Sequence, residues 1–283
     1  MVDGERLPLG VCLRSIRATP DWWLESARRL DAAGFAGVWC WDHFIGKGES
    51  TVPVVEAWTI LSMAAAQTSN VTVGTFVMNV MNRHPAVVAR MASTLQIASG
   101  GRCVLGIGIG GAPKEHEAYG IDFPAAPERV ARLEEAVAVI RSMWTGGPVT
   151  RDSPFYPLRG AVAHPVPEPP PPIIIGGETR PGAKLAARIG DGWSTFDDNF
   201  EANMPHYLEA LEEAGRSRAE QTVIVGFQGA WDRNASVVLD SAWVGAPRET
   251  WQRWHEAGAD GAIVLARTTE DVDALVDSVA RWT

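Results

Sequence analysis

Arg102–Gly120, RCVLGIGIGGAPKEHEAYG, is the stretch that decides the fold. Its first half alternates Val, Leu or Ile with glycine, so Gly106, Gly108 and Gly110 give up the packing that a buried strand gains from bulky side chains. We therefore expect a strand against which something flat lies closely. The polar segment that follows, Lys114–Glu117, is where chemistry or gating is expected, because loops after strands carry many functional side chains.

On both sides of this strand, strand-like and helical patterns alternate. The expected strands are Leu7–Arg14, Gly37–Phe44, Val71–Asn79, Arg102–Gly110, Ile173–Gly177, Gly192–Phe196, Thr222–Trp231 and Gly261–Ala266. The expected helices are Asp21–Ala33, Glu56–Gln67, Pro85–Ala98, Pro127–Trp144, Gly182–Ile189, Glu201–Glu213, Pro247–Ala257 and Asp271–Trp282. Most of the strands are continuous apolar runs, which is typical of a parallel sheet covered on both faces. Eight strand–helix pairs in 283 residues predict a TIM barrel, with a doubly wound sheet as the alternative.

One segment interrupts the alternation. PVPEPPPP, at Pro165–Pro172, cannot form a helix or a central strand. We interpret residues 146–172 as an insertion between the fourth helix and the fifth strand, with a hairpin over one face, inside a single domain spanning residues 1–283.

The composition of the chain limits the kinds of partner molecule that we expect it to bind. The net charge of −9 gives no global basic footprint for nucleic acid, and no apolar run approaches the roughly 20 residues of a membrane span. Cys12, Cys40 and Cys103 lack metal or redox spacing, so we expect three small buried side chains, a reducing cytoplasmic location and no metal site.

In a barrel of this kind, function is expected at the carboxyl ends of the strands. Asp42 and His43 follow the second strand and are a candidate acid/base pair, since histidine titrates near neutrality; the alternative is that Asp42 caps a segment and His43 fills a polar gap. Thr75, Asn79 and Thr195 lie at other strand ends, where a hydroxyl or an amide suits a heterocycle.

The fifth strand ends in Gly176-Gly177-Glu178-Thr179 and leads into a helix. Backbone N–H groups and the positive end of a helix dipole suit a phosphate, although glycine as simple turn punctuation is the alternative. The Gly-x-Gly-x-Gly of the fourth strand is not a dinucleotide fingerprint, because it does not follow the first strand and lacks the third glycine at the required offset.

Six motifs, taken together, give a resemblance that runs nearly end to end. They are GVWCWDHF (Gly37–Phe44), VTVGTFVMN with RHP (Val71–Asn79, Arg83–Pro85), SGGRCVLGIGIGG with EHEAYGI (Ser99–Gly111, Glu115–Ile121), ERVARLEEAVAVI (Glu128–Ile140), PPIIIGG (Pro171–Gly177) and AARIGDGWS (Ala186–Ser194). The chain resembles the luciferase-like flavin and deazaflavin oxidoreductases, most closely the branch that uses the deazaflavin coenzyme F420. That family folds as a TIM barrel.

The resemblance implies hydride transfer between F420, or alternatively FMN, and a small organic substrate, in a homodimer. It implies that Asp42 and His43 lie near the reactive ring. It also implies a non-proline cis peptide bond at Phe76–Val77 that props the ring. The remaining cofactor contacts that it implies are Thr75, Phe76, Val77 and Asn79, Gly108 and Gly110 beneath the ring, Gly176, Gly177, Glu178 and Thr179 at the phosphate, and Thr195.

The sequence departs from the sugar-phosphate dehydrogenases of this family. Gly111 stands where they carry a catalytic acid, Lys114 replaces a neutral amide, and no Trp follows the Asp-His pair, which argues against glucose-6-phosphate as the substrate. Arg180, Lys184 and Arg188 recur beside the expected phosphate loop and favour F420, with its anionic tail, over an FMN-dependent monooxygenase. A paralogue that only binds the cofactor is a third alternative, which the intact Asp42-His43 pair disfavours.

Overall fold

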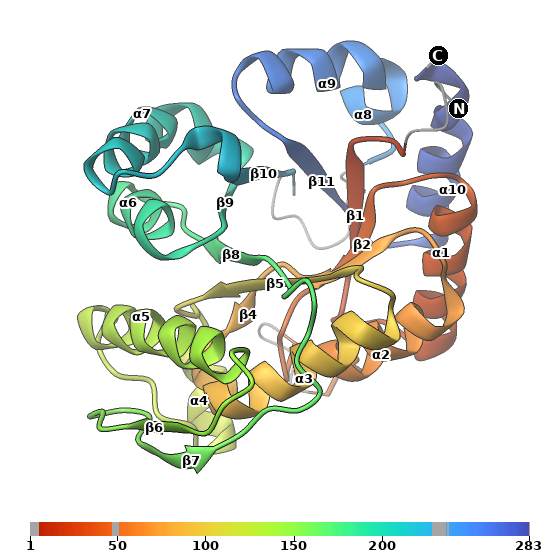
Figure 1. The fold of residues 1–283 in the computed structure, drawn as a ribbon. Coiled ribbons are helices and arrows are strands. Elements are labelled where there is room, and N and C mark those ends of the chain that lie inside the picture. Colours follow the sequence, from red (N-terminus) through yellow and green to blue (C-terminus); the bar gives the residue numbers. More distant parts are fainter. Residues whose placement is uncertain (1–5, 47–50, 228–235, 237, 283) are drawn as a thin grey trace.

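A closed barrel of parallel strands, surrounded by helices, forms the centre of the molecule (Figure 1). The computed structural model describes residues 6–46, 51–227, 236 and 238–282. Its sheet runs β3-β2-β1-β11-β10-β9-β8-β5-β4, and an additional β3–β5 pairing closes it. The predicted TIM barrel is therefore confirmed.

The barrel strands have the following bounds: β1 Leu9–Leu13, β2 Gly37–Cys40, β3 Thr72–Thr75, β4 Met78–Asn79, β5 Cys103–Gly108, β8 Ile173–Gly176, β9 Gly192–Phe196, β10 Thr222–Phe227 and β11 Gly261–Ala266. The longer helices are α1 Pro20–Ala32, α2 Ala57–Gln67, α3 Pro85–Ala98, α4 Pro113–Tyr119, α5 Ala126–Met143, α6 Arg180–Ile189, α7 Asp197–Glu213, α9 Pro247–Glu256 and α10 Thr269–Ser278. A short α8 spans Ala242–Gly245. No helix in the described ranges is long and apolar enough to cross a membrane.

Strand residues alternate between two apolar layers, as the period of a strand requires. In β1, Val11 and Leu13 belong to the large core shared with the helices, whereas Cys12 belongs to a smaller cluster with Trp39 and Phe76. This second cluster fills the barrel interior. The three cysteines are free and buried, as expected, and burial raises the pKa of the Cys103 thiol to about 12, so it stays protonated.

The third expected strand is not continuous, which corrects the prediction for Val71–Asn79. It divides into β3 and β4, and the peptide bond between them, Phe76–Val77, is cis, as predicted. The Thr75 hydroxyl donates to the Gly106 carbonyl 2.6 Å away, which ties this bulge to β5. A sequence rich in β-branched residues predicts extended backbone. It does not predict the point at which the strand is interrupted and its pairing with β5 starts again.

Three other segments differ from expectation or refine it. The polar segment after β5 is the helix α4 rather than a loop, and it ends at Gly120 in the left-handed conformation. The insertion carries the expected hairpin, β6 (Val149–Arg151) antiparallel to β7 (Leu158–Ala161), which lies beside α5 in Figure 1. The strand expected to reach Trp231 runs through β10 to Phe227, and residues 228–231 lie outside the described residues.

Candidate active site

Asp42 is buried at the end of β2, and its carboxylate is fully engaged. Arg83 donates to both oxygens, Nη1 to Oδ2 at 2.8 Å and Nη2 to Oδ1 at 3.0 Å. The Asn82 side chain donates to Oδ2 at 3.0 Å, and the Asn79 backbone N–H donates to it at 3.2 Å. These contacts join the end of β2 to the segment between β4 and α3, so the geometry gives Asp42 a bracing role.

Arg83 carries a second carboxylate contact, Nη2 to Glu56 Oε1 at 2.5 Å. Burial opposes its charge, but the hydrogen bonds and negative charges of Asp42 and Glu56 outweigh burial and raise the pKa of Arg83. His84 caps α3 by accepting from the Ala86 N–H, and Pro85 is the first helical residue. Arg83 and His84 thus brace the segment that leads into α3.

His43, next to Asp42, is oriented by a residue that sequence reasoning did not pair with it. Its Nδ1 lies 3.0 Å from Oε2 of Glu115, on α4. Because a carboxylate only accepts, Nδ1 carries the hydrogen, and Nε2 of the neutral ring is left free to exchange a proton. The His43 side chain is 22% exposed whereas that of Glu115 is 4% exposed, so the histidine has access to a ligand and the glutamate does not.

Glu115 is held in place by the chain that it contacts. Its Oε1 accepts from the backbone N–H groups of Phe44 and, at 2.9 Å, of Ile45. Burial opposes its ionisation, but the hydrogen bond from His43 and those two N–H groups outweigh burial and lower the pKa of Glu115. The only signal in the sequence was an acidic residue in the polar segment after the fourth strand.

Asn79, expected at the cofactor, is turned toward the protein. Its Nδ2 lies 2.8 Å from Nε2 of His116, and its Oδ1 accepts from the Met81 N–H at 3.0 Å. His116 is buried, and its Nδ1 donates to the Ala112 carbonyl at 2.9 Å. Both polar ends of the Asn79 side chain are therefore used: Nδ2 ties β4 to α4, and Oδ1 caps the turn that follows β4.

The glycines in and just after β5 make room for another part of the chain. A Cβ on Gly106 would collide with the Thr75 carbonyl, and one on Gly108 would lie 3.0 Å from Cγ2 of Val77. Gly110, at φ +75°, would place its Cβ 2.5 Å from the Asn79 amide. These glycines admit the bulge of residues 75–79, and the place of Gly108 and Gly110 beneath a ring stays a prediction.

An apolar hollow opens at the mouth of the barrel. We call it the mouth hollow; it is lined by Cys12, Trp41, Phe76, Phe196, Phe227, Ile263 and Leu265. Phe76 meets the rings of Trp39 and Phe196 edge-on, with centroids 6.3 and 5.8 Å apart. Trp41 in turn contacts the His43 ring at 6.3 Å and an interplanar angle of 90°. Trp41 therefore connects the His43 ring to the hollow.

Thr195, at the end of β9, is 3% exposed, and among the described residues its hydroxyl oxygen is buried with no hydrogen-bond partner. Leaving a buried hydroxyl unpaired costs about 1–3 kcal/mol. A ligand at the barrel mouth that exchanges a hydrogen bond with Thr195 would remove this cost.

The expected phosphate loop is formed only in part. The Gly177 N–H donates to the Ser194 carbonyl at 2.9 Å, so it is not available to an anion, which corrects that expectation. Thr179 caps α6 by accepting from the Gly182 N–H at 3.4 Å, and Gly176, Glu178 and Thr179 lie where β8 ends and α6 begins. Lys184 and Arg188 pair with Glu209 and Glu134, both at 2.8 Å, which weakens the argument for F420 drawn from them.

Comparison with known proteins adds independent evidence. The model of the luciferase-like monooxygenase family matches residues 12–279. The F420-dependent glucose-6-phosphate dehydrogenase of Kineococcus radiotolerans is 31% identical over 291 residues, which cover 100% of this chain and 85% of that protein. The F420-dependent hydroxymycolic acid dehydrogenase of Mycobacterium tuberculosis is 31% identical over 242 residues, covering 81% of this chain and 66% of that protein.

A solved structure has the same fold. It is an F420-dependent secondary alcohol dehydrogenase in complex with an F420-acetone adduct, with a TM-score of 0.83 at 20% identity, covering 98% of this chain and 99% of the other. The expected fold and the expected enzyme class, an oxidoreductase, are confirmed. The chain belongs to the luciferase-like monooxygenase family.

Proposed function

We propose that this protein is an F420-dependent oxidoreductase that transfers a hydride between the deazaflavin and a small organic substrate. The observation that carries the proposal is the His43–Glu115 pair, placed beside the mouth hollow. Both relatives and the structural neighbour are named as F420-dependent enzymes. When bound, F420 supplies the ring carbon that accepts or donates the hydride.

The residues at the barrel mouth fit a flat heterocycle with polar edges. The unpaired Thr195 hydroxyl offers a hydrogen bond, Phe76 and Val77 form the bulge that faces the mouth, and Gly176, Glu178 and Thr179 at the rim suit a phosphate. Asn79 and Thr75 support this surface from behind, because their side chains are bound to His116 and Gly106.

His43 moves the proton that accompanies the hydride. Glu115 holds its Nδ1–H, so Nε2 takes a proton from a substrate hydroxyl during oxidation, or returns it to a carbonyl oxygen during reduction. The anionic Glu115 stabilises the imidazolium formed in the first case. Asp42 does not reach the substrate; it is a positioning residue that holds the chain next to His43 through Arg83.

We also propose that glucose-6-phosphate is not the substrate, although it is the substrate named for relatives. At Gly111, where that branch carries its acid, nothing in the described structure lies within 4 Å of a Cβ position. The space is open to a substrate of different shape. The three buried, unpaired cysteines also support the expected cytoplasmic location.

Titration of the purified protein with F420 is expected to quench its tryptophan fluorescence at micromolar cofactor, because Trp41 lines the mouth hollow. FMN is expected to bind at least 10-fold more weakly in the same assay. Tighter binding of FMN would instead support the FMN-dependent monooxygenase. Tight binding of F420 without turnover of any alcohol or carbonyl compound would support a paralogue that only binds cofactor.

We propose in addition that the chain forms a homodimer through α2 and α3. These helices are poor in charge: α2 has no charged residue and α3 has only Arg90. Met63, Val87 and Ile97 on them are 41%, 52% and 47% exposed. On a chain of net charge −9, an uncharged face is the surface on which two copies repel each other least.

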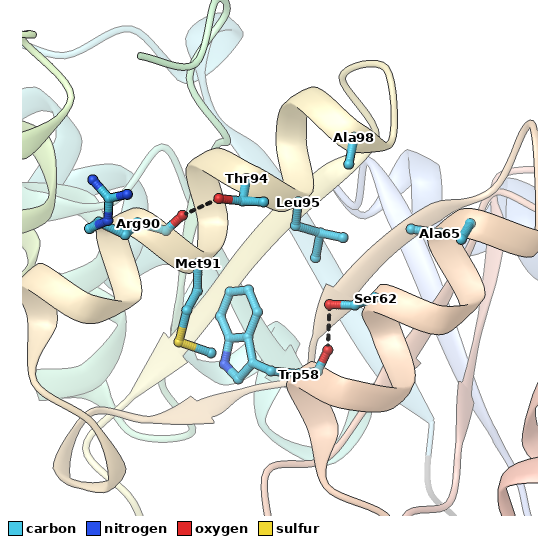
Figure 2. Close-up of a pocket in the computed structure, with 9 residues that line it drawn as sticks. Trp58, Ser62, Ala65, Arg90, Met91, Thr94, Leu95 and Ala98 are labelled. Carbon is cyan, nitrogen blue, oxygen red and sulfur yellow. Dashed lines mark hydrogen bonds between the residues drawn. The ribbon is translucent and has the colours of Figure 1, made fainter. Parts of the chain in front are cut away.

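Figure 2 shows the groove between these helices, a pocket of about 410 Å³ with Trp58, Met91 and Leu95 on its walls. The small side chains of Ala65, Ala66 and Ala98 also line it. Small residues at a helix–helix contact let two helices approach closely, which suits α2 or α3 of a second copy lying in the groove.

Ala66→Glu is expected to convert the protein to a monomer, because it places a charge in the middle of the apolar groove. Sedimentation equilibrium measures the change. Leu208→Glu is the matched control, since Leu208 is 41% exposed on α7, away from the groove, and the dimer should persist. A monomeric wild-type protein, or a dimer that survives Ala66→Glu, would contradict the proposed interface.

A further inference from the structure

Two arginines stand side by side at the carboxyl ends of β1 and β11. Leu13 pairs with Ala266 in the parallel register, and the Arg14 N–H donates to the Ala266 carbonyl at 3.1 Å, so Arg14 and Arg267 follow at neighbouring positions. Two residues before them, Cys12 and Leu265 line the mouth hollow. Arg14 and Arg267 therefore follow the strands at the end of the barrel where the hollow opens.

The Arg14 guanidinium is half-buried, and one of its N–H groups is unsatisfied by the described residues. Among the described residues its Nε atom is buried and has no hydrogen-bond partner. The guanidinium lies over the Trp22 ring, with Cζ 5.7 Å from the ring centroid, which holds the planar group in one orientation. Buried charges in proteins are usually paired, so an oriented arginine with an unsatisfied N–H suits an external anion.

The charges around Arg14 are mainly positive. Burial lowers the pKa of Arg14, and the positive charges of Arg17 and Arg267 lower it further, while Asp271 opposes them. Asp271 is fully buried and already engaged: it accepts from the Ser236 hydroxyl and from the backbone N–H groups of Arg267 and Thr268, the latter two at 2.7 and 3.1 Å. Its carboxylate caps α10 and holds the backbone of Arg267.

We propose that Arg14 is an anion subsite that binds a carboxylate or phosphate group of the substrate at the mouth of the barrel. The proposal rests on the proposed function, and it adds the chemical class of the substrate. Guanidinium groups bind both anions through two parallel hydrogen bonds. His43 reaches the same hollow through Trp41, so an anchored anion would present another part of the substrate to His43.

This subsite is separate from the place proposed for the cofactor phosphate. Gly176–Thr179 follows β8, which pairs with β5 and β9, whereas Arg14 and Arg267 follow β1 and β11. In the order of the sheet, β9 and β10 lie between β8 and β11. A cofactor and an anionic substrate can therefore occupy the mouth from different sides.

Calorimetric titration of the cofactor-free protein with inorganic phosphate, and separately with acetate, tests the subsite. At least one anion is expected to bind with millimolar affinity, and Arg14→Met is expected to weaken that binding 10-fold or more. Binding of phosphate alone identifies a phosphate subsite, and binding of acetate alone identifies a carboxylate subsite. Arg253→Met is the matched control, because Arg253 is 71% exposed on α9, and it should bind as the wild type does.

If Arg14→Met does not fold, Arg14→Lys keeps the charge but loses the planar fork, and a several-fold weaker affinity is expected. The Arg14 Nε–H signal in a nitrogen-correlated NMR spectrum, identified by its absence in either variant, should shift on adding the anion. Absence of binding by both anions, or equal affinity in the wild type and the Arg14 variants, would overturn the proposal. Because F420 takes no part in these measurements, failure here is distinguishable from failure of the F420 titration.

Discussion

His43→Ala is expected to reduce turnover about 100-fold or more while changing the affinity for F420 by no more than a few-fold. The size follows from the usual contribution of a positioned acid/base group, about 10²–10⁴. The structure supports this split because the His43 side chain is 22% exposed and, among the described residues, Glu115 is the titrating group that it contacts. Its removal should therefore leave the barrel packing intact. Steady-state rates and the fluorescence titration measure the two effects.

His206→Ala is the control, since His206 is also partly exposed but lies on α7 with Glu209 as its neighbour. That variant should keep both activity and affinity. If His43→Ala instead lowers thermal stability in parallel with its rate, His43 fills a polar gap in the fold, which was the alternative reading of the sequence.

Asp42→Asn is expected to lower the free energy of unfolding by about 3 kcal/mol. Arg83 and Asn82 both donate hydrogen bonds to this side chain, so the NH₂ group of the new amide would face another donor. The half-buried Arg83 would keep Glu56 as its remaining carboxylate partner. Urea unfolding followed by circular dichroism measures the loss.

Asp152→Asn is the matched control. Asp152 pairs with Arg159 at 2.9 Å, but the two side chains are 92% and 67% exposed. Exposed pairs contribute about 0–1 kcal/mol, so this substitution should leave stability nearly unchanged. An Asp42→Asn protein that is as stable as the wild type but inactive would move Asp42 from bracing to catalysis.

The sequence was sufficient for the barrel because each strand and helix is marked by its own local pattern. Gly192–Phe196 and Gly261–Ala266 appear with the predicted bounds, and α3 begins at Pro85 as punctuation predicts. The cis bond at Phe76–Val77 was predicted from the family resemblance and not from a sequence pattern. These features depend on residues close together in the chain.

Contacts between distant segments could not be predicted in the same way. His43 and Glu115 are 72 positions apart, and nothing in either segment specifies that the loop after β2 meets α4. The glycines of β5 show the same limit. Their sequence signals a close approach, but not whether a ligand or, as observed, the backbone of residues 75–79 makes it.

Val77 occupies a place that three strands share. A Cβ added to Gly108 would lie 3.0 Å from its side chain, and one added to Gly176 would lie 2.8 Å from it. The volumes at positions 77, 108 and 176 are therefore not independent: a methyl group gained at either glycine requires one to be lost at residue 77. In relatives that keep this bulge, substitutions at these positions should arise as compensating pairs. The shape of the barrel mouth therefore depends on residues from three strands at once.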